Sequence, residues 1–233
     1  MTRYRAASGP EGGYEPGSRQ RVLRNLLGIK SKAEMNQVEA DAMDAVQQRY
    51  YTDGIVTGET RFTAALIRQM HEDWLGGIYE WAGRYRTVDM SKGDFAFPPA
   101  YLIEQNMASL ESRLLAMATP CRPSAVSEVC VTIARVHADL LLIHPFRDGN
   151  GRLARWLANL MATQAGLPTP DYGFAGRDSE KQREDYLSAV LKGYRGDCSD
   201  LAAFFERAVE RKLAFERSLA RERGEAPSNT KDS

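Results

Sequence analysis

The chain has 233 residues, with 31 basic and 31 acidic side chains and therefore no formal net charge. This length can bury an apolar core without disulfide or metal staples, and the balanced charge excludes a chain-wide basic field for nucleic acid. The three cysteines show no C-x-x-C spacing, which argues against a disulfide framework or a cysteine-rich zinc site and favours a reducing cytoplasm.

The first 20 residues are rich in Gly, Pro, Ser and Arg and contain no apolar core of an export signal. Such a composition cannot bury enough apolar surface to offset the entropy of ordering, so we expect a flexible tail over residues 1–20. No later stretch reaches the ~20 apolar residues of a membrane span. We therefore expect a cytoplasmic protein without membrane contact, and secretion as an effector stays open.

Apolar residues recur about every 3.6 residues in several segments, which predicts amphipathic helices and a mainly α domain. The stripes are Phe62, Leu66, Met70, Trp74 and Ile78; Val129, Ile133, Val136, Leu140 and Ile143; and Leu153, Trp156, Leu157 and Leu160. Pro145 predicts the end of the second helix, and Gly166 predicts the end of the third. A further helix is expected to begin with Ser199 as its N-cap.

Residues 84–99 break the helical pattern. Polar and apolar residues alternate over 87–90 and 95–97, on either side of Lys92-Gly93-Asp94, which predicts a short β-hairpin closed by a glycine-containing turn. A lone hairpin is marginally stable, so we expect it to rest on the helical body and to leave one strand edge exposed.

The segment between the second and third predicted helices carries the candidate chemistry. It reads His144-Pro145-Phe146-Arg147-Asp148-Gly149-Asn150-Gly151-Arg152, followed by Arg155. Because the next helix begins near Gly151, its first N–H groups and the positive end of its dipole form an anion site. Gly149 and Gly151 let the backbone approach a phosphate closely, and Asn150 can donate a side-chain hydrogen bond to it.

The charged residues of this segment complete a nucleotide site. Asp148 would repel a phosphate unless a hard cation such as Mg²⁺ lay between them. Arg152 and Arg155 lie one turn apart and can reach the outer phosphates, while His144 can take a proton near neutral pH. Each feature alone is typical of an ordinary turn. The hypothesis of an enzymatic nucleotide site requires that the His144 imidazole be accessible to solvent. It also requires that the amides beside Gly149 and Gly151 be free of protein acceptors.

HPFRDGNGR followed by Arg155 resembles, without exception, the H-P-F-x-[D/E]-G-N-G-R-x-x-R signature of the Fic family. IYEWAGRYRTVDMSKGDFAFPPAYL resembles the family's flap region, and residues 21–211 resemble a whole Fic domain. The resemblance implies an all-α helical bundle with a short β-hairpin flap beside the active-site loop. It also implies transfer of AMP from Mg-ATP to a Ser, Thr or Tyr hydroxyl of a target protein.

By this resemblance, His144 is the general base, Asp148 holds Mg²⁺ and Phe146 anchors the loop in the core. The implied nucleotide-binding residues are Gly149, Asn150, Gly151, Arg152 and Arg155. The implied target-docking flap is Met90, Ser91, Lys92, Gly93, Asp94, Phe95, Ala96 and Phe97. There, an extended target segment would add to the sheet edge through main-chain hydrogen bonds.

Fic proteins are commonly inhibited by a helix bearing an [S/T]-x-x-x-E-[G/N] motif. Ser218 and Glu222 fit its first five positions, but Arg223 stands where Gly or Asn is expected. Residues 212–233 are therefore expected to be a helix end and polar tail, in which this pair is either inhibitory or a solvated i, i+4 pair. Inhibition by a separate antitoxin and assembly into a homo-oligomer stay open.

Five aromatic and imidazole side chains outside the loop have less specific expectations. Trp74, Trp81 and Trp156 are expected in the core, and His71 at the surface or its boundary. His137 precedes His144 by two helical turns, about 10.5 Å, which is too far for both to bind one metal ion.

Two other functions stay open at this stage. Fic relatives with altered glycines transfer other groups or nucleotides, and some remove AMP, whereas the intact GNGR favours AMP transfer. The second alternative is a nucleotide-binding regulatory module without transferase output, although binding alone does not need His144. The target is not encoded in the loop, and both a bacterial toxin and a secreted effector fit it.

Overall fold

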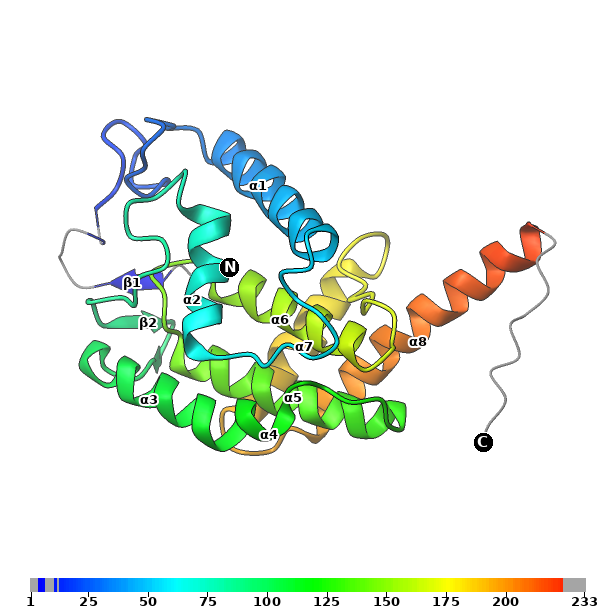
Figure 1. Ribbon diagram of the computed structural model, residues 1–233. Helices are drawn as coiled ribbons and strands as arrows, with labels where there is room; N and C mark the ends of the chain where they lie inside the picture. Colours follow the sequence, from blue (N-terminus) through cyan, green and yellow to red (C-terminus); the bar gives the residue numbers. More distant parts are fainter. Residues whose placement is uncertain (1–3, 7–10, 12, 224–233) are drawn as a thin grey trace. The chain divides into compact units, whose positions relative to one another are not determined.

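The computed structural model describes residues 4–6, 11 and 13–223 (Figure 1). The described chain is mostly helical with one small sheet, which confirms the predicted all-α fold with a hairpin. It divides into two compact units, Met1–Pro120 with Val136–Ala158, and Cys121–Arg135 with Asn159–Ser233. Helices α5 (Val126–Ile143) and α6 (Asn150–Gln164) contribute residues to both units.

The first unit begins its helical part with α1 (Lys32–Thr52) and α2 (Ala64–Leu75). Hydroxyl caps start both helices, because Ser31 Oγ accepts from the Glu34 amide at 3.4 Å and Thr63 Oγ1 from the Leu66 amide at 3.1 Å. A 3₁₀ turn (Ala100–Leu102) leads into α3 (Ile103–Leu110), a π-helical turn (Glu111–Leu115) and α4 (Ala116–Ala118). The sequence pattern predicted α2 but not α1.

The helices on either side of the candidate loop follow their predicted stop signals. Helix α5 ends at Ile143, two residues before Pro145. After α6, Gly166 adopts φ +76° and the Leu167 amide donates to the Ala162 carbonyl at 2.9 Å. This is the left-handed C-terminal cap that the glycine predicted.

The core of the first unit contains all three tryptophans. Trp74, Trp81 and Trp156 are 2%, 8% and 0% exposed, which confirms their predicted core positions. The expectation for His71 was wrong, because it is 0% exposed. Its two ring nitrogens have partners inside the fold, as described below, so the cost of burying the imidazole is offset by hydrogen bonds.

The sheet has the strand order β1-β2-β3, with β1 (Tyr4–Ala6), β2 (Met90–Lys92) and β3 (Phe95–Ala96). The hairpin β2–β3 confirms the prediction, and Gly93 in its turn adopts φ +60°. Strand β1 pairs antiparallel with β2, so that Tyr4 lies opposite Lys92 and Ala6 opposite Met90 (Figure 1). The N-terminal strand therefore covers the β2 edge of the hairpin, and β3 remains an outer strand of the sheet, in line with the expected exposed edge.

Described residues before α1 also make main-chain hydrogen bonds. The Glu15 amide donates to the Val22 carbonyl at 2.9 Å, and the Arg24 amide donates to the Gly13 carbonyl at 3.0 Å. Ser18 in the intervening turn is buried. Main-chain bonds thus involve β1 and part of residues 13–20, and the flexibility predicted for residues 1–20 stays a prediction. Residues 1–3, 7–10 and 12 lie outside the described part.

The second unit contains α7 (Ser179–Gly193) and α8 (Ser199–Glu222). The rings of Phe174, Tyr186 and Phe204 lie within 6.4 Å of one another and form its aromatic core. Ser199 is the first residue of α8 rather than its cap, and its amide donates to the Asp197 carboxylate at 3.0 Å. The helix continues to Glu222, so the predicted C-terminal segment is helical over residues 212–222, and residues 224–233 lie outside the described part.

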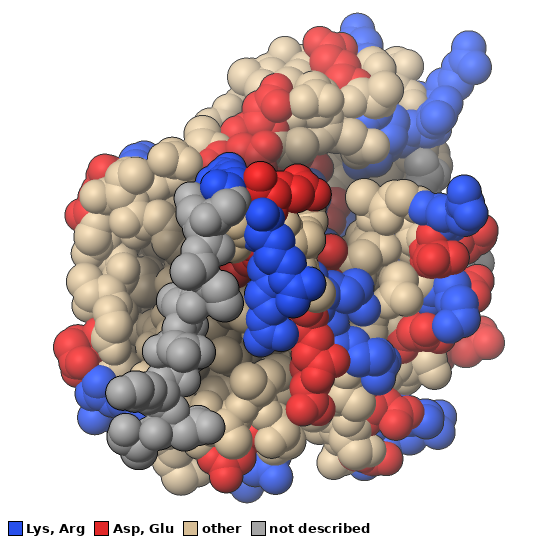
Figure 2. Space-filling model, turned by 90° about the vertical axis from the view of Figure 1, so that its right-hand side faces the viewer, with Lys and Arg blue, Asp and Glu red and all other residues tan. Residues whose placement is uncertain are grey.

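The surface carries both signs of charge. Lys and Arg side chains lie interspersed with Asp and Glu on the face seen in Figure 2, as the equal numbers of basic and acidic residues lead one to expect. Within the described residues, no helix has the length and apolarity needed to cross a membrane. All three cysteines are free thiols, as their spacing predicted.

Candidate active site

The loop between α5 and α6 begins with a backbone reversal at His144. This residue has φ +51°, which is rare for a side chain with a Cβ, and its amide still donates to the Leu140 carbonyl at 3.1 Å. Pro145 then prevents the helix from continuing. Holding a non-glycine residue in this region costs of order 1–3 kcal/mol, so the surrounding contacts must fix it.

Asn150 closes the loop on itself. Its Oδ1 accepts from the Phe146 amide at 3.0 Å and its Nδ2 donates to the Phe146 carbonyl at 2.7 Å, and both residues are buried. Because Nδ2 carries a second hydrogen, the expected donation from Asn150 to a phosphate stays a prediction. Both functional ends of the amide are already bonded to the backbone, so the side chain holds the loop in shape.

The loop rests on aromatic and imidazole rings of α2. The Phe146 ring is fully buried and stacks on the His71 ring at 3.9 Å, as expected of a core anchor. Gly149 adopts φ +83°, and a Cβ there would lie 2.8 Å from the Trp74 ring and 3.3 Å from His71 Nε2. A glycine is therefore required here both by the backbone conformation and by the space.

His71 supports the loop in a defined tautomer. Its Nδ1 accepts a hydrogen bond from the Gly83 amide at 2.9 Å, so the hydrogen of the neutral ring must be on Nε2. Nε2 then donates to the Asp148 carbonyl at 3.1 Å. Burial lowers the pKa of His71 to about 4, so the ring stays neutral and keeps this arrangement at physiological pH.

The predicted anion site lies at the start of α6. The first hydrogen bond of the helix runs from the Leu153 amide to the Gly149 carbonyl at 2.9 Å. The amides of Asn150, Gly151 and Arg152 precede it, so the helix itself does not use them. The Gly149 amide, by contrast, donates to Asp148 Oδ1 at 2.6 Å. The requirement for amides without protein acceptors thus fails at Gly149.

Asp148 is half-buried and directly precedes Gly149, the last residue before α6. The described residues contain no cluster of three or more His, Cys, Asp or Glu side chains that could hold a metal ion. A lone carboxylate next to a phosphate site nevertheless fits Mg²⁺, which is commonly bound by one or two carboxylates together with phosphate oxygens and water.

Two arginines of α6 border the anion site. Arg152 Nη1 donates to Glu39 Oε2 of α1 at 2.8 Å, and its guanidinium lies 4.6 Å from the centre of the Trp74 ring. Arg155 Nη1 is the atom nearest to a Cβ built on Gly151, at 3.6 Å. Both cations therefore lie where the helix N-terminus is positive. Glu39 was missed from the sequence because no predicted helix contained it.

The imidazole of His144 is buried, with 3% exposure, which contradicts the requirement for accessibility. The ring of Phe97, directly after β3, stacks on it with 3.9 Å between ring centres. Its Nδ1 faces the Leu141 carbonyl at 3.2 Å, so Nδ1 carries the hydrogen and Nε2 is the nitrogen able to accept a proton. Burial lowers the pKa of His144 to about 3, which leaves the ring in the neutral form that a base requires.

Arg86 connects the flap to His144, and the sequence analysis missed it. This residue is 2% exposed, and its guanidinium donates to three carbonyls: Nε to His144 at 2.8 Å, Nη1 to Val88 at 2.7 Å and Nη2 to Pro98 at 2.6 Å. The Arg86 amide also donates to the Pro145 carbonyl at 2.8 Å. One buried cation thus fixes the strained turn and both ends of the flap.

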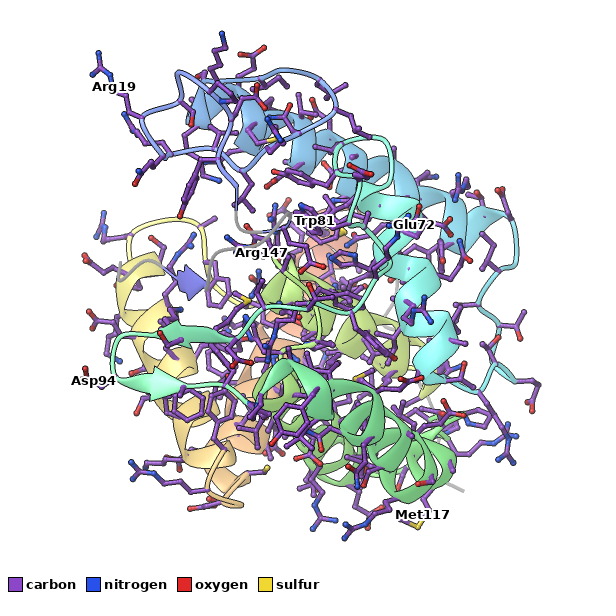
Figure 3. All side chains as sticks on the ribbon, turned by 90° about the vertical axis from the view of Figure 1, so that its left-hand side faces the viewer. Arg19, Glu72, Trp81, Asp94, Met117 and Arg147 are labelled. Carbon is purple, nitrogen blue, oxygen red and sulfur yellow. The ribbon has the colours of Figure 1, made fainter. Side chains whose placement is uncertain are left out.

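The flap itself projects beyond this attachment. Figure 3 shows Asp94 at the tip of the hairpin, and Arg147 of the loop within the body of the first unit. Arg147 is buried and its Nε donates to the Glu11 carbonyl at 2.9 Å, while the Glu11 carboxylate accepts from the Thr87 amide at 3.0 Å. The segment after β1 is therefore bonded both to the loop and to the start of the flap.

The candidate inhibitory residues lie on the solvent-exposed end of α8. Both Ser218 and Glu222 are exposed, and the Ser218 hydroxyl donates to the Phe215 carbonyl of the same helix at 2.8 Å. Their predicted role stays a prediction.

Comparison with known proteins places this loop in a described family. Residues 61–162 match the Fic/DOC family. The chain is 27% identical to the "Probable protein adenylyltransferase y4lH" of Sinorhizobium fredii, over 90% of this chain and 100% of that protein. It is 28% identical to the "Protein adenylyltransferase VbhT" of Bartonella schoenbuchensis, over 89% of this chain but 40% of that protein.

Solved structures show the same fold. The BepC effector protein of Bartonella tribocorum, solved with bound AMPPNP, matches with a TM-score of 0.63 and 20% identity, over 80% of this chain and 91% of that chain. The N-terminal Fic domain of a Bep effector from Bartonella sp. AR 15-3 matches with a TM-score of 0.67 and 18% identity, over 88% of this chain and 92% of that chain.

Proposed function

The chain belongs to the Fic/DOC family through residues 61–162, and we propose that it is a protein adenylyltransferase that moves AMP from ATP to a hydroxyl side chain of a target protein. One observation carries the proposal. Within the described part of the chain, the helical ladder of α6 does not use the amides of Asn150, Gly151 and Arg152, and the carboxylate of Asp148 and the guanidinium groups of Arg152 and Arg155 belong to the same loop and first turns of α6 that follow His144. The names of the relatives described above support the same chemistry.

The reaction joins the target hydroxyl oxygen to the α-phosphorus of ATP and breaks the bond between that phosphorus and the bridging oxygen of pyrophosphate. His144 Nε2 takes the hydroxyl proton, and pyrophosphate leaves with the electron pair. Little covalent help is needed, so positioning and charge neutralisation supply most of the rate. The turn's amides and the two arginines hold the phosphates.

Mg²⁺, held by Asp148, neutralises part of the phosphate charge when it is bound. The buried imidazole requires one further step. Because the Phe97 ring covers His144, the target hydroxyl reaches Nε2 only when the flap moves that ring aside. Docking of an extended target segment on the flap would supply such a displacement.

The cellular setting is part of the proposal. A cytoplasmic toxin restrained by an antitoxin and a secreted effector both fit this chemistry, and the Bartonella structures are described as secretion-system effectors. Inhibition by Ser218 and Glu222 is tested by Glu222→Gly, which raises labelling at least tenfold if the C-terminal helix is inhibitory. A separate antitoxin predicts no change in the isolated protein.

The direct test uses ATP labelled at the α or the γ phosphate, incubated with a cell lysate and the purified protein. Relative to lysate alone, whose own kinases use γ-labelled ATP, we expect wild-type protein to add α-labelled bands and no γ-labelled ones. We expect His144→Ala to lose about 10²–10⁴-fold of the α-labelling, as is typical of losing a general base. Glu34→Gln, at an exposed position of α1, serves as the control with unchanged labelling. Transfer of the γ-label instead would identify a phosphotransferase, and equal labelling by His144→Ala would remove the assigned base.

A further inference from the structure

Glu39 is a buried acid that meets the candidate phosphate site from a different helix. It lies on the inner face of α1 and is 2% exposed. A carboxylate is costly to bury unless it is paired and hydrogen-bonded, and here it is both. Its Oε2 accepts from Arg152 Nη1 at 2.8 Å, and its Oε1 accepts from the Tyr79 hydroxyl at 2.5 Å.

The position of Glu39 is itself fixed from two sides. Trp74 Nε1 donates to the Glu39 backbone carbonyl at 2.9 Å. Tyr79, which holds the other carboxylate oxygen, has its pKa raised by burial and by Glu39, so its hydroxyl stays a donor throughout the physiological range. The carboxylate is therefore a fixed acceptor rather than a mobile surface charge.

Arg152 is held against this acceptor and still faces solvent. Its side chain is 33% exposed and its guanidinium lies 4.6 Å from the centre of the Trp74 ring. Within the described part of the chain, its hydrogen bond to Glu39 uses one of five N–H donors. The ring beneath and the carboxylate beside it restrict the rotation of a long side chain that would otherwise sample many rotamers.

We propose that Glu39 is a positioning residue for Arg152: it holds the guanidinium on the Trp74 ring with its remaining donors toward the triphosphate of ATP. The inference rests on the proposed function, because it takes the anion at the α6 N-terminus to be the ATP tail. Glu39 touches neither the nucleotide nor the reacting atoms in this role. It lowers the entropy that Arg152 loses when ATP binds.

The sign of the effect separates positioning from simple electrostatics. Glu39→Gln removes a negative charge next to a site for a polyanion, so charge alone predicts tighter ATP binding. Positioning predicts the reverse, because a neutral amide holds the Arg152 guanidinium more weakly than a carboxylate does. In a competing role, Glu39 binds Arg152 and so keeps it from the nucleotide. That role, like charge alone, predicts tighter ATP binding by Glu39→Gln.

The experiment measures the affinity for Mg-ATP by calorimetry, without target and without turnover. We expect Glu39→Gln to weaken binding about tenfold, within the range of coupling between contacting residues. Glu34→Gln removes the same charge from an exposed position of the same helix and should leave the affinity within about twofold of wild type. Thermal unfolding of each variant checks the fold.

A double-mutant cycle distinguishes positioning from general damage. In an Arg152→Gln background, Glu39→Gln should cost less than about twofold in affinity, because the residue it positions is gone. Equal losses in both backgrounds, or unchanged or tighter binding in Glu39→Gln alone, overturn the inference. If Glu39→Gln does not fold, Tyr79→Phe removes one restraint on Glu39 and should weaken binding about threefold; unchanged affinity overturns the inference equally.

Failure of the proposed function gives a different result. Wild-type protein that does not bind Mg-ATP refutes the proposed function, and the inference with it. Wild-type protein that binds Mg-ATP and labels targets, next to a Glu39→Gln variant of equal affinity, refutes only the positioning role.

Discussion

The catalytic loop and the flap lie side by side but are built in opposite ways. The loop is fixed by buried contacts, with Asn150 bonded twice to Phe146 and His71 bonded to the Asp148 carbonyl. The flap consists of strands of three and two residues with an exposed tip, and its β2 edge is shared with an N-terminal strand. The proposed function thus assigns chemistry to the part that cannot rearrange cheaply, and recognition to the part that can.

Replacing Gly149 should give the largest effect, because it disturbs the fixed region. Gly149→Ala forces a Cβ to 2.8 Å from Trp74 at φ +83°, and we expect a loss of about 2–5 kcal/mol in unfolding free energy, the sum of backbone strain and overpacking. Denaturant titration measures it.

Gly176→Ala is the matched control for that variant. Gly176 adopts φ +84° but has no atom within 4 Å of a built Cβ, so backbone strain alone should cost about 1–2 kcal/mol. Equal losses in the two variants would show that the packing under the loop is not tight.

Lowering the pH should reduce stability through the imidazoles of the buried region rather than through the flap. Burial lowers the pKa of His137 to about 3, from an ordinary value near 6.5 that it regains on unfolding. The unfolded chain therefore binds a proton below pH 6.5 that the folded chain refuses, and stability falls as the pH drops. Each such imidazole lowers the free energy of unfolding by about 1.4 kcal/mol at pH 5.5.

Urea titrations at pH 7.5 and 5.5 on wild type and His137→Leu measure this contribution. The variant should lose about 1.4 kcal/mol less than wild type over that interval. An identical loss would mean that the His137 imidazole is not protected from protons in the folded state.

Removing residues 1–7 tests the flap. This deletion removes β1 while keeping Glu11, whose carbonyl accepts from Arg147, and it frees the β2 edge for a target strand. We expect target labelling to rise about threefold, since strand pairing of this length contributes only fractions of a kcal/mol per residue pair. Gel quantification of the labelled target measures the rise. Unchanged labelling would assign target docking to the β3 edge.

Asp94→Ala should have the smallest effect. Asp94 is exposed at the hairpin tip, so the unfolding free energy should change by less than about 0.5 kcal/mol (Figure 3). A loss comparable to that of Gly149→Ala would show that the tip supports the loop, and the contrast between the two regions would disappear.

The sequence predicted the segments that carry a clear local pattern of apolar and turn residues. It did not predict the features that depend on contacts between residues far apart in the chain. Helices α5 and α6, the hairpin and the loop carry periodic apolar residues, glycines and Pro145, and all were found. Helix α1 was missed although Met35, Met43, Val46 and Tyr50 of its buried face recur at helical spacing, whereas the burial of Glu39 on that face is explained only by its distant partners Tyr79 and Arg152. The pairing of β1 with β2 joins residues more than eighty positions apart, which no local pattern encodes.

The same limit applies within the site. The residue types of the loop indicated the chemistry, but the burial of His144 under Phe97 and the use of Asn150 inside the loop depend on tertiary contacts. Arg86 has no motif of its own. It was found only because its three carbonyl partners surround it in the structure.

The clamp formed by Arg86 makes the flap a replaceable module. Its guanidinium sets the separation of Val88 and Pro98 and holds the His144 carbonyl, while residues 91–95 lie outside its reach. New sequences can therefore be grafted over residues 91–95, and His144 keeps its place under Phe97. Engineers seeking another protein target can randomise the hairpin tip and leave the transfer chemistry untouched.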